Sequence, residues 1–445
     1  MGTRRAGVGR AVIATVAIAV VVIVAIGLGS YIITAPHPVY CCTTVISTTS
    51  NVSTLSQTSS TLTNSQPGIL WTKTMNFASG VTIYSQDDDG IGPVALTQDG
   101  SEVVVGTGQA IGNGSVYAFN DKGESLWSHA LNHSVSSISV SANGSLVAVG
   151  GYEIARGPSG FYENGALYLF NGQGKMLWDK SLGGPGPSVK LSSDGSRMAV
   201  ATESGILYMN DRGQTLWSFS AGGNGNIDGI DMSPDGSNIV ASVMYRPNTE
   251  NWSWSFLSFS DAGKLLWNYT SISPGGSTYA AGVQITSDGS TLASSDVSGK
   301  NGTLYLFDRS GNILWSLQMY SPALAIQTAN QSSDVVLQTN WSTLVVDARG
   351  HLVANYTGQQ LPSTTSSSGS SCTTPAFWES NLGSTNVLFL NGQGAPLSGY
   401  SLNRMVSSVA LSADDRYAAV VSNQDNSAVL FLMSLTESGP GCASG

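Results

Sequence analysis

The stretch GALYLFNGQGKMLW, from Gly165 to Trp178, decides the fold because close copies of it recur along the chain. One copy is GTLYLFDRSGNILW, from Gly302 to Trp315, and further copies include Trp127, Trp217 and Trp267. In each copy an apolar strand is followed by a short turn with Gly and by a second strand that carries Trp. The motif therefore predicts a β-hairpin that is repeated along the chain.

A second motif precedes each copy of the first. It is a strand, a turn of the type Ser-x-Asp-Gly-Ser and another strand, as in VKLSSDGSRMAVAT with Asp194 and Gly195. The other clear copies have Asp99, Asn143, Asp235 and Asp288 in the turn, each followed by Gly. Asp or Asn can accept a backbone hydrogen bond in such a turn and Gly can take a positive φ. Together the two motifs give four antiparallel strands per repeat of roughly 40 to 50 residues, which is the size of a propeller blade.

The repeat count predicts how the ring closes. About eight copies of the second motif are found if SCTTPAFWESNLG, residues 371–383, is accepted as a degraded one. The strand ILWTKTM, residues 69–75, precedes all complete repeats, and the last repeat lacks its own outer strand. We expect the first strand to complete the last blade and leave no open edge. The fold class is thus all-β, a propeller of eight four-stranded blades, with seven as the alternative, behind one N-terminal transmembrane helix.

The motif resembles the repeat of the pyrroloquinoline-quinone-like (quinoprotein-type) propeller superfamily, Ala-x-Asp-x-x-Thr-Gly-x-x-x-Trp. The stretches YAFNDKGESLW, YLFNGQGKMLW and YLFDRSGNILW keep its Gly-to-Trp spacing, although the preceding turn is one residue shorter and lacks the Thr. The SPDG turn at Asp235 is similar to those of WD-repeat propellers. The resemblance covers residues 69–435. It implies that the motif's Trp packs between blades, as a wide indole does well.

The resemblance to quinoprotein-type propellers does not extend to an enzymatic site. The adjacent pair Cys41 and Cys42 resembles the disulfide of quinone-dependent dehydrogenases, but it precedes the first propeller strand, and no calcium-ligand set matches. His129 and His133, in HALNH, have ligand-like spacing without a third partner. A propeller enzyme, either a quinoprotein-type oxidoreductase or a glycan hydrolase, therefore remains the alternative to a binding protein. No cofactor is predicted.

The N-terminal part predicts a membrane anchor. Residues 1–10 are basic, with Arg4, Arg5 and Arg10, and residues 11–34 form an uncharged apolar run long enough to span a bilayer as a helix. The positive-inside bias puts residues 1–10 in the cytoplasm and the remaining chain outside. A cleaved signal peptide is the alternative. The anchor resembles those of archaeal surface proteins and pilin-like proteins. A Ser/Thr-rich stalk, residues 35–68, the propeller, residues 69–437, and a tail, residues 438–445, follow.

Composition and charge limit the classes of partner that the protein can bind. Only 10% of the 445 residues are charged, and the formal net charge of −10 with a pI near 4.7 argues against nucleic-acid binding. Recurring Asn-x-Ser/Thr sequons suit an extracellular glycoprotein. Cys372 and Cys442 are expected to form a disulfide, with two buried thiols as the alternative.

Hairpin geometry predicts where recognition occurs. The uniform turns of both motifs lie at one end of the strands, so the long, variable connections share the other end, which we expect to be the recognition face. Two segments there, YEIARGPSGFYENG and MYRPNTENWSWSF, offer aromatic and charged side chains for a glycan or a protein hot spot. An alternative is that each is a lengthened hairpin whose aromatics pack on one another. The predicted binding residues are Tyr152, Arg156, Phe161, Tyr162, Glu163, Tyr245, Arg246, Trp252 and Trp254.

A further acidic stretch could bind a metal. Asp87, Asp88 and Asp89, in QDDDG, offer hard oxygens that could ligate Ca²⁺, although a solvated acidic turn is the alternative. The function that these observations favour is a membrane-anchored, extracytoplasmic β-propeller that acts as a binding or scaffold module for protein or glycan at the cell surface. Its expected location is the cell membrane, with a single span.

Overall fold

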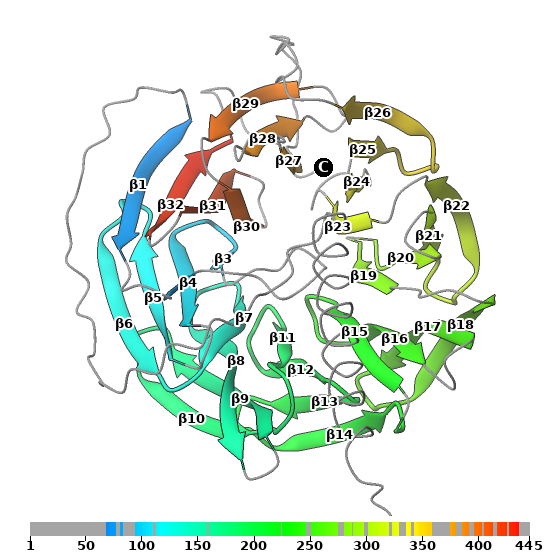
Figure 1. Ribbon diagram of the computed structural model, residues 1–445, viewed down its shortest axis with the longest axis horizontal. Helices are drawn as coiled ribbons and strands as arrows, with labels where there is room; N and C mark the ends of the chain where they lie inside the picture. The colour runs from blue at the N-terminus through cyan, green and yellow to red at the C-terminus, as the bar shows by residue number, and fades with distance from the viewer. Residues whose placement is uncertain are drawn as a thin grey trace, which may run out of the picture. The chain divides into compact units, whose positions relative to one another are not determined.

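The computed structural model is an all-β propeller in which the sheets are arranged in a ring (Figure 1). No helix in the described part of the chain is long and apolar enough to cross a membrane, and the predicted membrane segment, residues 11–34, lies outside that part. The structure describes residues 68–76, 81–82, 94–109, 113–157, 160–223, 225–245, 251–274, 280–286, 288–297, 301–319, 323–328, 335–339, 342–357, 374–379, 385–390, 396–402, 405–412, 416–424 and 427–435.

The first half of the ring contains four sheets of antiparallel strands, each built from consecutive strands of the sequence. The first has β2 (Val81–Thr82), β3 (Val94–Leu96), β4 (Glu102–Gln109), β5 (Gly114–Asn120) and β6 (Ser125–Leu131). The second has β7 (Ser134–Val140), β8 (Leu146–Gly157), β9 (Gly160–Asn171) and β10 (Met176–Ser181). The third has β11 (Ser188–Leu191), β12 (Arg197–Thr202), β13 (Gly205–Asn210) and β14 (Thr215–Ser220). The fourth has β15 (Gly225–Met232), β16 (Asn238–Tyr245), β17 (Asn251–Ser260) and β18 (Leu265–Pro274).

The second half repeats this plan and closes the ring. One sheet has β19 (Ala280–Ile285), β20 (Thr291–Val297), β21 (Asn301–Phe307) and β22 (Ile313–Met319), and the next has β23 (Ala323–Thr328), β24 (Val335–Thr339), β25 (Ser342–Val346) and β26 (Leu352–Thr357). A sheet of β27 (Thr374–Glu379), β28 (Thr385–Leu390) and β29 (Pro396–Leu402) follows. The closing sheet has β30 (Met405–Leu411), β31 (Tyr417–Gln424), β32 (Ser427–Ser434) and β1 (Ile69–Asn76).

The predicted closure is confirmed. Strand β1 pairs antiparallel with β32, from Ile69 opposite Met433 to Asn76 opposite Ser427, so the first strand completes the last blade. Pairing the two ends of the propeller in one sheet leaves no open gap in that blade.

The prediction of eight four-stranded blades is wrong. The structure shows seven blades of four antiparallel strands, one of which also carries the two-residue strand β2. The sheet of β27, β28 and β29 has three strands among the described residues. Its first part is the stretch expected to be a degraded hairpin, residues 371–383, and only β27 comes from it. This stretch has no Ser-x-Asp-Gly-Ser turn, and such a turn is what folds the other copies back on themselves.

The repeated Trp packs between blades, as the sequence predicts. A side chain added at Gly174 would lie 2.5 Å from Trp127 of the preceding blade, and Gly174 has a φ of 76°, which favours glycine. The same Gly-on-Trp contact recurs at Gly123, Gly213, Gly263, Gly311 and Gly350. Five indole N–H groups also donate to a backbone carbonyl of the next blade's turn, those of Trp71, Trp127, Trp178, Trp217 and Trp315. Each of these Trp side chains therefore packs between neighbouring sheets, and all but Trp267 also hydrogen-bond to the next blade.

The Asp of the other turn has the expected role. Asp194 Oδ1 accepts hydrogen bonds from the Ser196 N–H, 2.9 Å away, and from the Ser192 hydroxyl, 2.7 Å away. These hydrogen bonds hold the pKa of the Asp194 carboxyl below its usual range. Successive turns are also joined, because the Ala142 N–H donates to Ser193 O and the Ser193 N–H donates to Pro234 O. The uniform end of the propeller is thus tied together from blade to blade.

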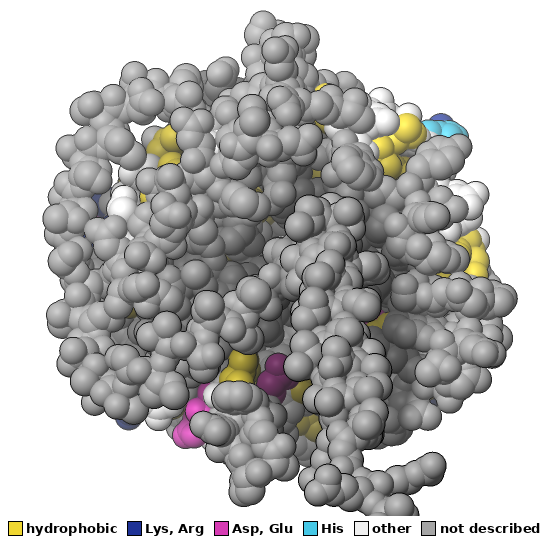
Figure 2. Space-filling view, in the orientation of Figure 1, with side chains coloured by type: hydrophobic (Ala, Val, Ile, Leu, Met, Phe, Trp, Pro, Cys, Tyr) yellow, Lys and Arg dark blue, Asp and Glu magenta, His cyan; other side chains and the backbone are white. Residues whose placement is uncertain are grey.

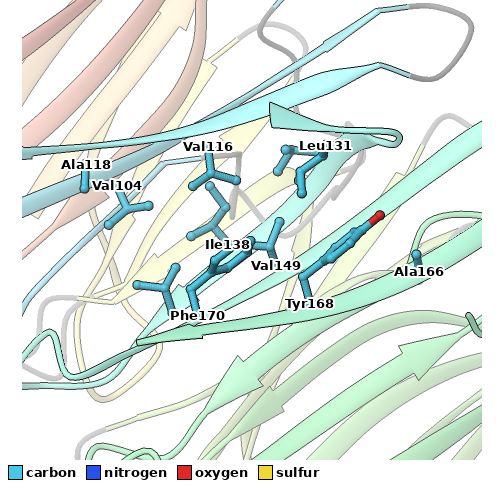
Figure 3. Close-up of a cluster of buried hydrophobic side chains, with 11 residues drawn as sticks. Val104, Val116, Ala118, Leu131, Ile138, Val149, Ala166, Tyr168 and Phe170 are labelled. Carbon is cyan, nitrogen blue, oxygen red and sulfur yellow. The ribbon is translucent and has the colours of Figure 1, made fainter. Parts of the chain in front are cut away.

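The hydrophobic core lies in the interfaces between blades. One cluster joins Val104, Val116 and Ala118 of the first sheet to Val149 and Phe170 of the second (Figure 3). Strands in the middle of the blades are buried on both faces, as β12 illustrates with the four central residues of its six. Because each blade buries apolar faces against two neighbours, the ring positions its connections rigidly.

Candidate functional site

The second blade has an elongated hairpin at the end of the ring opposite the uniform turns. Strands β8 and β9 have 12 residues each, whereas β12 and β13 have six each. The register of β8 and β9 is continuous from Leu146 opposite Asn171 to Gly157 opposite Gly160. Beyond Tyr152, the hairpin continues for five pairs, which at about 3.3 Å per residue corresponds to roughly 17 Å.

The first predicted binding segment therefore forms strands rather than a loop. Arg156 lies opposite Phe161, and Tyr162 and Glu163 precede the base of the hairpin on β9. Glu163 is exposed, as the prediction requires. Tyr152 is only 6% exposed, so the prediction that it offers an exposed aromatic ring is wrong.

The second predicted segment is a hairpin of β16 and β17. Tyr245, at the end of β16, is half-buried and lies opposite Ser253, and Trp252 lies opposite Ser273 of β18. Arg246 lies outside the described residues. Trp254 is 1% exposed, and its ring is 4.7 Å from Phe256 and 6.0 Å from both Tyr269 and Tyr305.

Trp254 is therefore part of the core. The prediction that it is an exposed binding residue is wrong, and the alternative of a lengthened hairpin with packed aromatics is the one observed. The physical reason is the alternation of a strand, which directs Trp254 and Phe256 to the same face, where β21 of the next blade covers them.

At the base of the β8–β9 hairpin, five polar residues form a group that we name the His133 cluster: His133, Glu153, Asn164, Tyr168 and Asp179. His133 lies in the connection between β6 and β7, and its Nδ1 is hydrogen-bonded to the Tyr168 hydroxyl at 2.6 Å. In Figure 3 the Tyr168 ring extends away from Phe170 and carries its hydroxyl toward the end of the sheet near Ala166. The Asn164 Nδ2 donates to Glu153 Oε1 at 3.0 Å.

The electrostatics of this cluster favour neutral forms of His133 and Tyr168. Burial lowers the pKa of His133, against the opposing effect of the Glu153 and Asp179 carboxylates. Burial, helped by the same two carboxylates, raises the pKa of Tyr168 to about 12. The His133 Nε2 is buried and has no hydrogen-bond partner among the described residues. This holds whichever ring nitrogen carries the proton.

The connection from β10 to β11 braces the same place. Asn164 forms an isolated parallel bridge with Gly184, and the Leu182 N–H donates to Gly165 O at 2.8 Å. A side chain at Gly165 would lie 2.5 Å from Pro185 O, so the connection packs against the hairpin backbone. The hairpin is thereby supported at its base by a hydrogen-bonded cluster on one face and by a tightly packed connection on the other.

No metal site is found where the described ranges allow a search, since no group of three or more His, Cys, Asp or Glu residues there could hold an ion. His129 instead packs its ring against Phe170, with centroids 5.0 Å apart. The predicted Ca²⁺ ligands Asp87, Asp88 and Asp89, and the predicted disulfide of Cys372 with Cys442, lie outside the described residues.

Sequence reasoning missed how the His133 cluster is assembled. Glu153 and Asn164 lie inside the segment YEIARGPSGFYENG, and Tyr168 lies inside the fold-deciding motif, but neither stretch indicates that they meet His133. The only signal was the spacing of His129 and His133. The contact depends on the register of β8 with β9, which places Glu153 opposite Asn164.

No family model matches the chain, and no curated protein matches it. Among solved structures, 551 chains match. The C-terminal WD40 domain of Sif2 is similar over 81% of this chain and 99% of its own length, with 13% sequence identity and a TM-score of 0.53. The β-propeller domain of Cps50 (Swd1) from Myceliophthora thermophila covers 81% of this chain and 100% of its own, with 10% identity and a TM-score of 0.47. At such identities the comparison with the WD40 domain shows the fold, a WD40-like β-propeller.

Proposed function

We propose that this chain is a membrane-anchored, extracytoplasmic β-propeller that binds a protein or a glycan at the cell surface and acts as a scaffold there. The observation that carries the proposal is the β8–β9 hairpin, which is twice as long as β12–β13 and projects at the end opposite the uniform turns. Segments that diverge on a rigid scaffold are where propellers and other repeat folds place recognition.

The binding residues proposed on this hairpin are those that project beyond its braced base: Arg156, Phe161, Tyr162 and Glu163. A second set of proposed binding residues, Tyr245 and Trp252, lies on the β16–β17 hairpin of the fourth blade. The sequence adds Arg246 to this proposal. A planar cation beside aromatic residues suits both a glycan and a protein hot spot.

The membrane part of the proposal rests on the sequence. Residues 11–34 supply the anchor, the basic residues before them set the orientation, and the Ser/Thr-rich stretch to residue 68 separates the anchor from the propeller. Fractionation checks this part: the full chain is expected in the membrane pellet and resistant to carbonate extraction. A full chain that is released by carbonate would contradict the anchor without touching the binding proposal.

The binding part is tested by shortening the hairpin. In one variant residues 154–163 are replaced by Asn-Gly, which keeps Glu153 opposite Asn164 and closes the strands with a favoured two-residue turn. We expect this variant to lose partners in surface pull-downs and ligands on a glycan array while it unfolds at the same temperature. Lys175→Ala, in an exposed turn at the other end, is the matched control and is expected to bind like the natural chain. Unchanged binding by the shortened variant would remove the hairpin from the recognition face.

A further inference from the structure

The projecting part of the β8–β9 hairpin has an unoccupied strand edge. Strand β7 accompanies β8 only as far as the pair Ser134 and Tyr152. From Glu153 to Gly157, β8 pairs with β9 on one side, and no described strand pairs with it on the other side. A row of unpaired backbone N–H and C=O groups on an extended strand is a template for another strand.

The direction of the backbone groups follows from one hydrogen bond. Gly165 O accepts from the Leu182 N–H, so the backbone of Gly165 faces away from β8. In an antiparallel ladder the direction of the backbone groups alternates along each strand. The two residues of a pair either both face each other or both face away from each other. The residues opposite Gly165 and its alternate neighbours Glu163 and Phe161 are Tyr152, Ile154 and Arg156. Ile154 and Arg156 therefore direct their N–H and C=O groups to the open side of β8.

The other edge of the hairpin is different at its base. Residues Leu182 and Gly183 donate to Gly165 O, and Gly184 bridges Asn164. The β10–β11 connection thus covers the start of the β9 edge, whereas no described strand pairs with the β8 edge beside Ile154. The open edge of β8 is the one that continues the line of β7.

The charge around this edge favours a basic partner. On the hairpin beyond Tyr152, the two carboxylates Glu153 and Glu163 outnumber the one basic residue, Arg156. Asp179 of β10 and Glu203 of the β12–β13 turn add negative charge on the β9 side of the hairpin. Glu163, Asp179 and Glu203 are exposed. In Figure 2 Asp and Glu side chains are visible in the lower part of the face, where Figure 1 places β8 to β12.

We propose that the β8 edge from Ile154 to Arg156 accepts an extended, Lys- or Arg-bearing segment of a partner protein as an added strand. Main-chain hydrogen bonds to Ile154 and Arg156 supply the pairing, and the surrounding carboxylates select basic side chains. This inference rests on the proposed function and names the class of partner for the same hairpin.

The test uses the full chain and a displayed library of random ten-residue peptides. Recovered peptides are expected to be rich in Lys, Arg and β-branched residues. Each is then synthesised with and without N-methylation at alternate residues, which removes N–H groups and keeps the side chains. N-methylation in the pairing register is expected to weaken binding at least tenfold, and methylation in the other register to leave it unchanged.

Variants of the chain locate the site. Ile154→Pro removes an N–H that faces the open side and is expected to weaken peptide binding at least tenfold, because proline is tolerated on a strand edge. Lys175→Ala, at an exposed residue at the other end of the ring, is the control and is expected to bind normally. The double variant Glu153→Gln, Glu163→Gln leaves the backbone intact and is expected to reduce both affinity and its dependence on salt.

Three results would overturn the inference. The first is that the selection recovers no basic peptide, and the second is that all N-methylated forms bind equally. The third is that the chain dimerises through this edge and that Ile154→Pro abolishes the dimer, which would make a second copy the occupant. If Ile154→Pro keeps the partners that the shortened hairpin loses, strand addition fails and the proposed function stands.

Discussion

Two interfaces between blades hold the same tyrosine of the same motif in different surroundings. Tyr168 follows Gly165 by three residues, as Tyr305 follows Gly302. At the interface of the first and second sheets, the His133 interface, the Tyr168 hydroxyl meets His133. At the interface of the fourth and fifth sheets, the Trp254 interface, Tyr305 packs among the rings of Trp254, Phe256 and Phe307.

The difference shows what a repeat does and does not specify. The motif places a tyrosine on the face toward the preceding blade in both cases. What it meets is decided by the preceding blade and by the connection beside it, which are outside the motif. One interface is therefore a polar brace at the base of the proposed recognition hairpin, and the other is aromatic core.

The largest effect is expected from removing the centre of the Trp254 interface. Trp254→Ala deletes a side chain that is 1% exposed and surrounded by aromatic rings, and such truncations destabilise by about 3–5 kcal/mol. Chemical unfolding followed by circular dichroism measures the change. Leu266→Ala, at a residue 47% exposed on the outer strand β18, is the control and is expected to change stability by less than about 0.5 kcal/mol. A small loss for Trp254→Ala would mean that this ring is not packed as core.

The wedge at the His133 interface is tested at Gly174. Gly174→Ala is expected to destabilise by about 2–3 kcal/mol, because alanine is strained at a φ of 76° and its Cβ would lie 2.5 Å from Trp127. Gly183→Ala has a similar φ of 67° with nothing within 4 Å of the added Cβ, so it is expected to cost about 1 kcal/mol of backbone strain alone. Equal losses in the two variants would show that the Trp127 contact contributes nothing.

A smaller effect is expected from the polar contact itself. Tyr168→Phe leaves the His133 Nδ1 without its partner and is expected to destabilise by about 1–2 kcal/mol. A double-mutant cycle with His133→Ala separates the contact from the packing of each ring. A coupling energy near zero, against the expected value of roughly 0.5–1.5 kcal/mol, would contradict the brace.

The smallest effect is a pH dependence that only the His133 interface has. Because burial lowers the pKa of His133, this imidazole takes up a proton below about pH 6.5 in the unfolded chain but only at a lower pH in the folded chain. Stability from this group is thus fully present above that pH and falls as the pH drops through the folded pKa. Unfolding measured from pH 7.5 to 5 checks how steeply stability changes with pH, and His133→Gln is expected to reduce this dependence.

In the alkaline range, absorbance titration is expected to show Tyr168 ionising near 12.

Much of the fold could be predicted because the repeat has a physical meaning at each position. Gly174 and Trp178 indicated a turn and an inter-blade wedge, and residues 69–75 indicated closure with the last repeat, as β1 and β32 show. The blade count could not be predicted, because residues 371–383 have strand-like composition without the turn that defines a hairpin. Two of the predicted binding side chains, Tyr152 and Trp254, are buried, which could not be predicted because their burial depends on contacts made by the folded ring.

The sequence by itself determined that this protein is a closed ring of hairpins, since Gly and Asp turns and alternating apolar strands are local properties that each repeat carries alone. Only the tertiary structure decided which aromatics are core and which polar groups meet. Burial of Trp254 and the contact of Tyr168 with His133 each require a neighbouring blade, and side chains from separate repeats interact only when the ring brings those blades together.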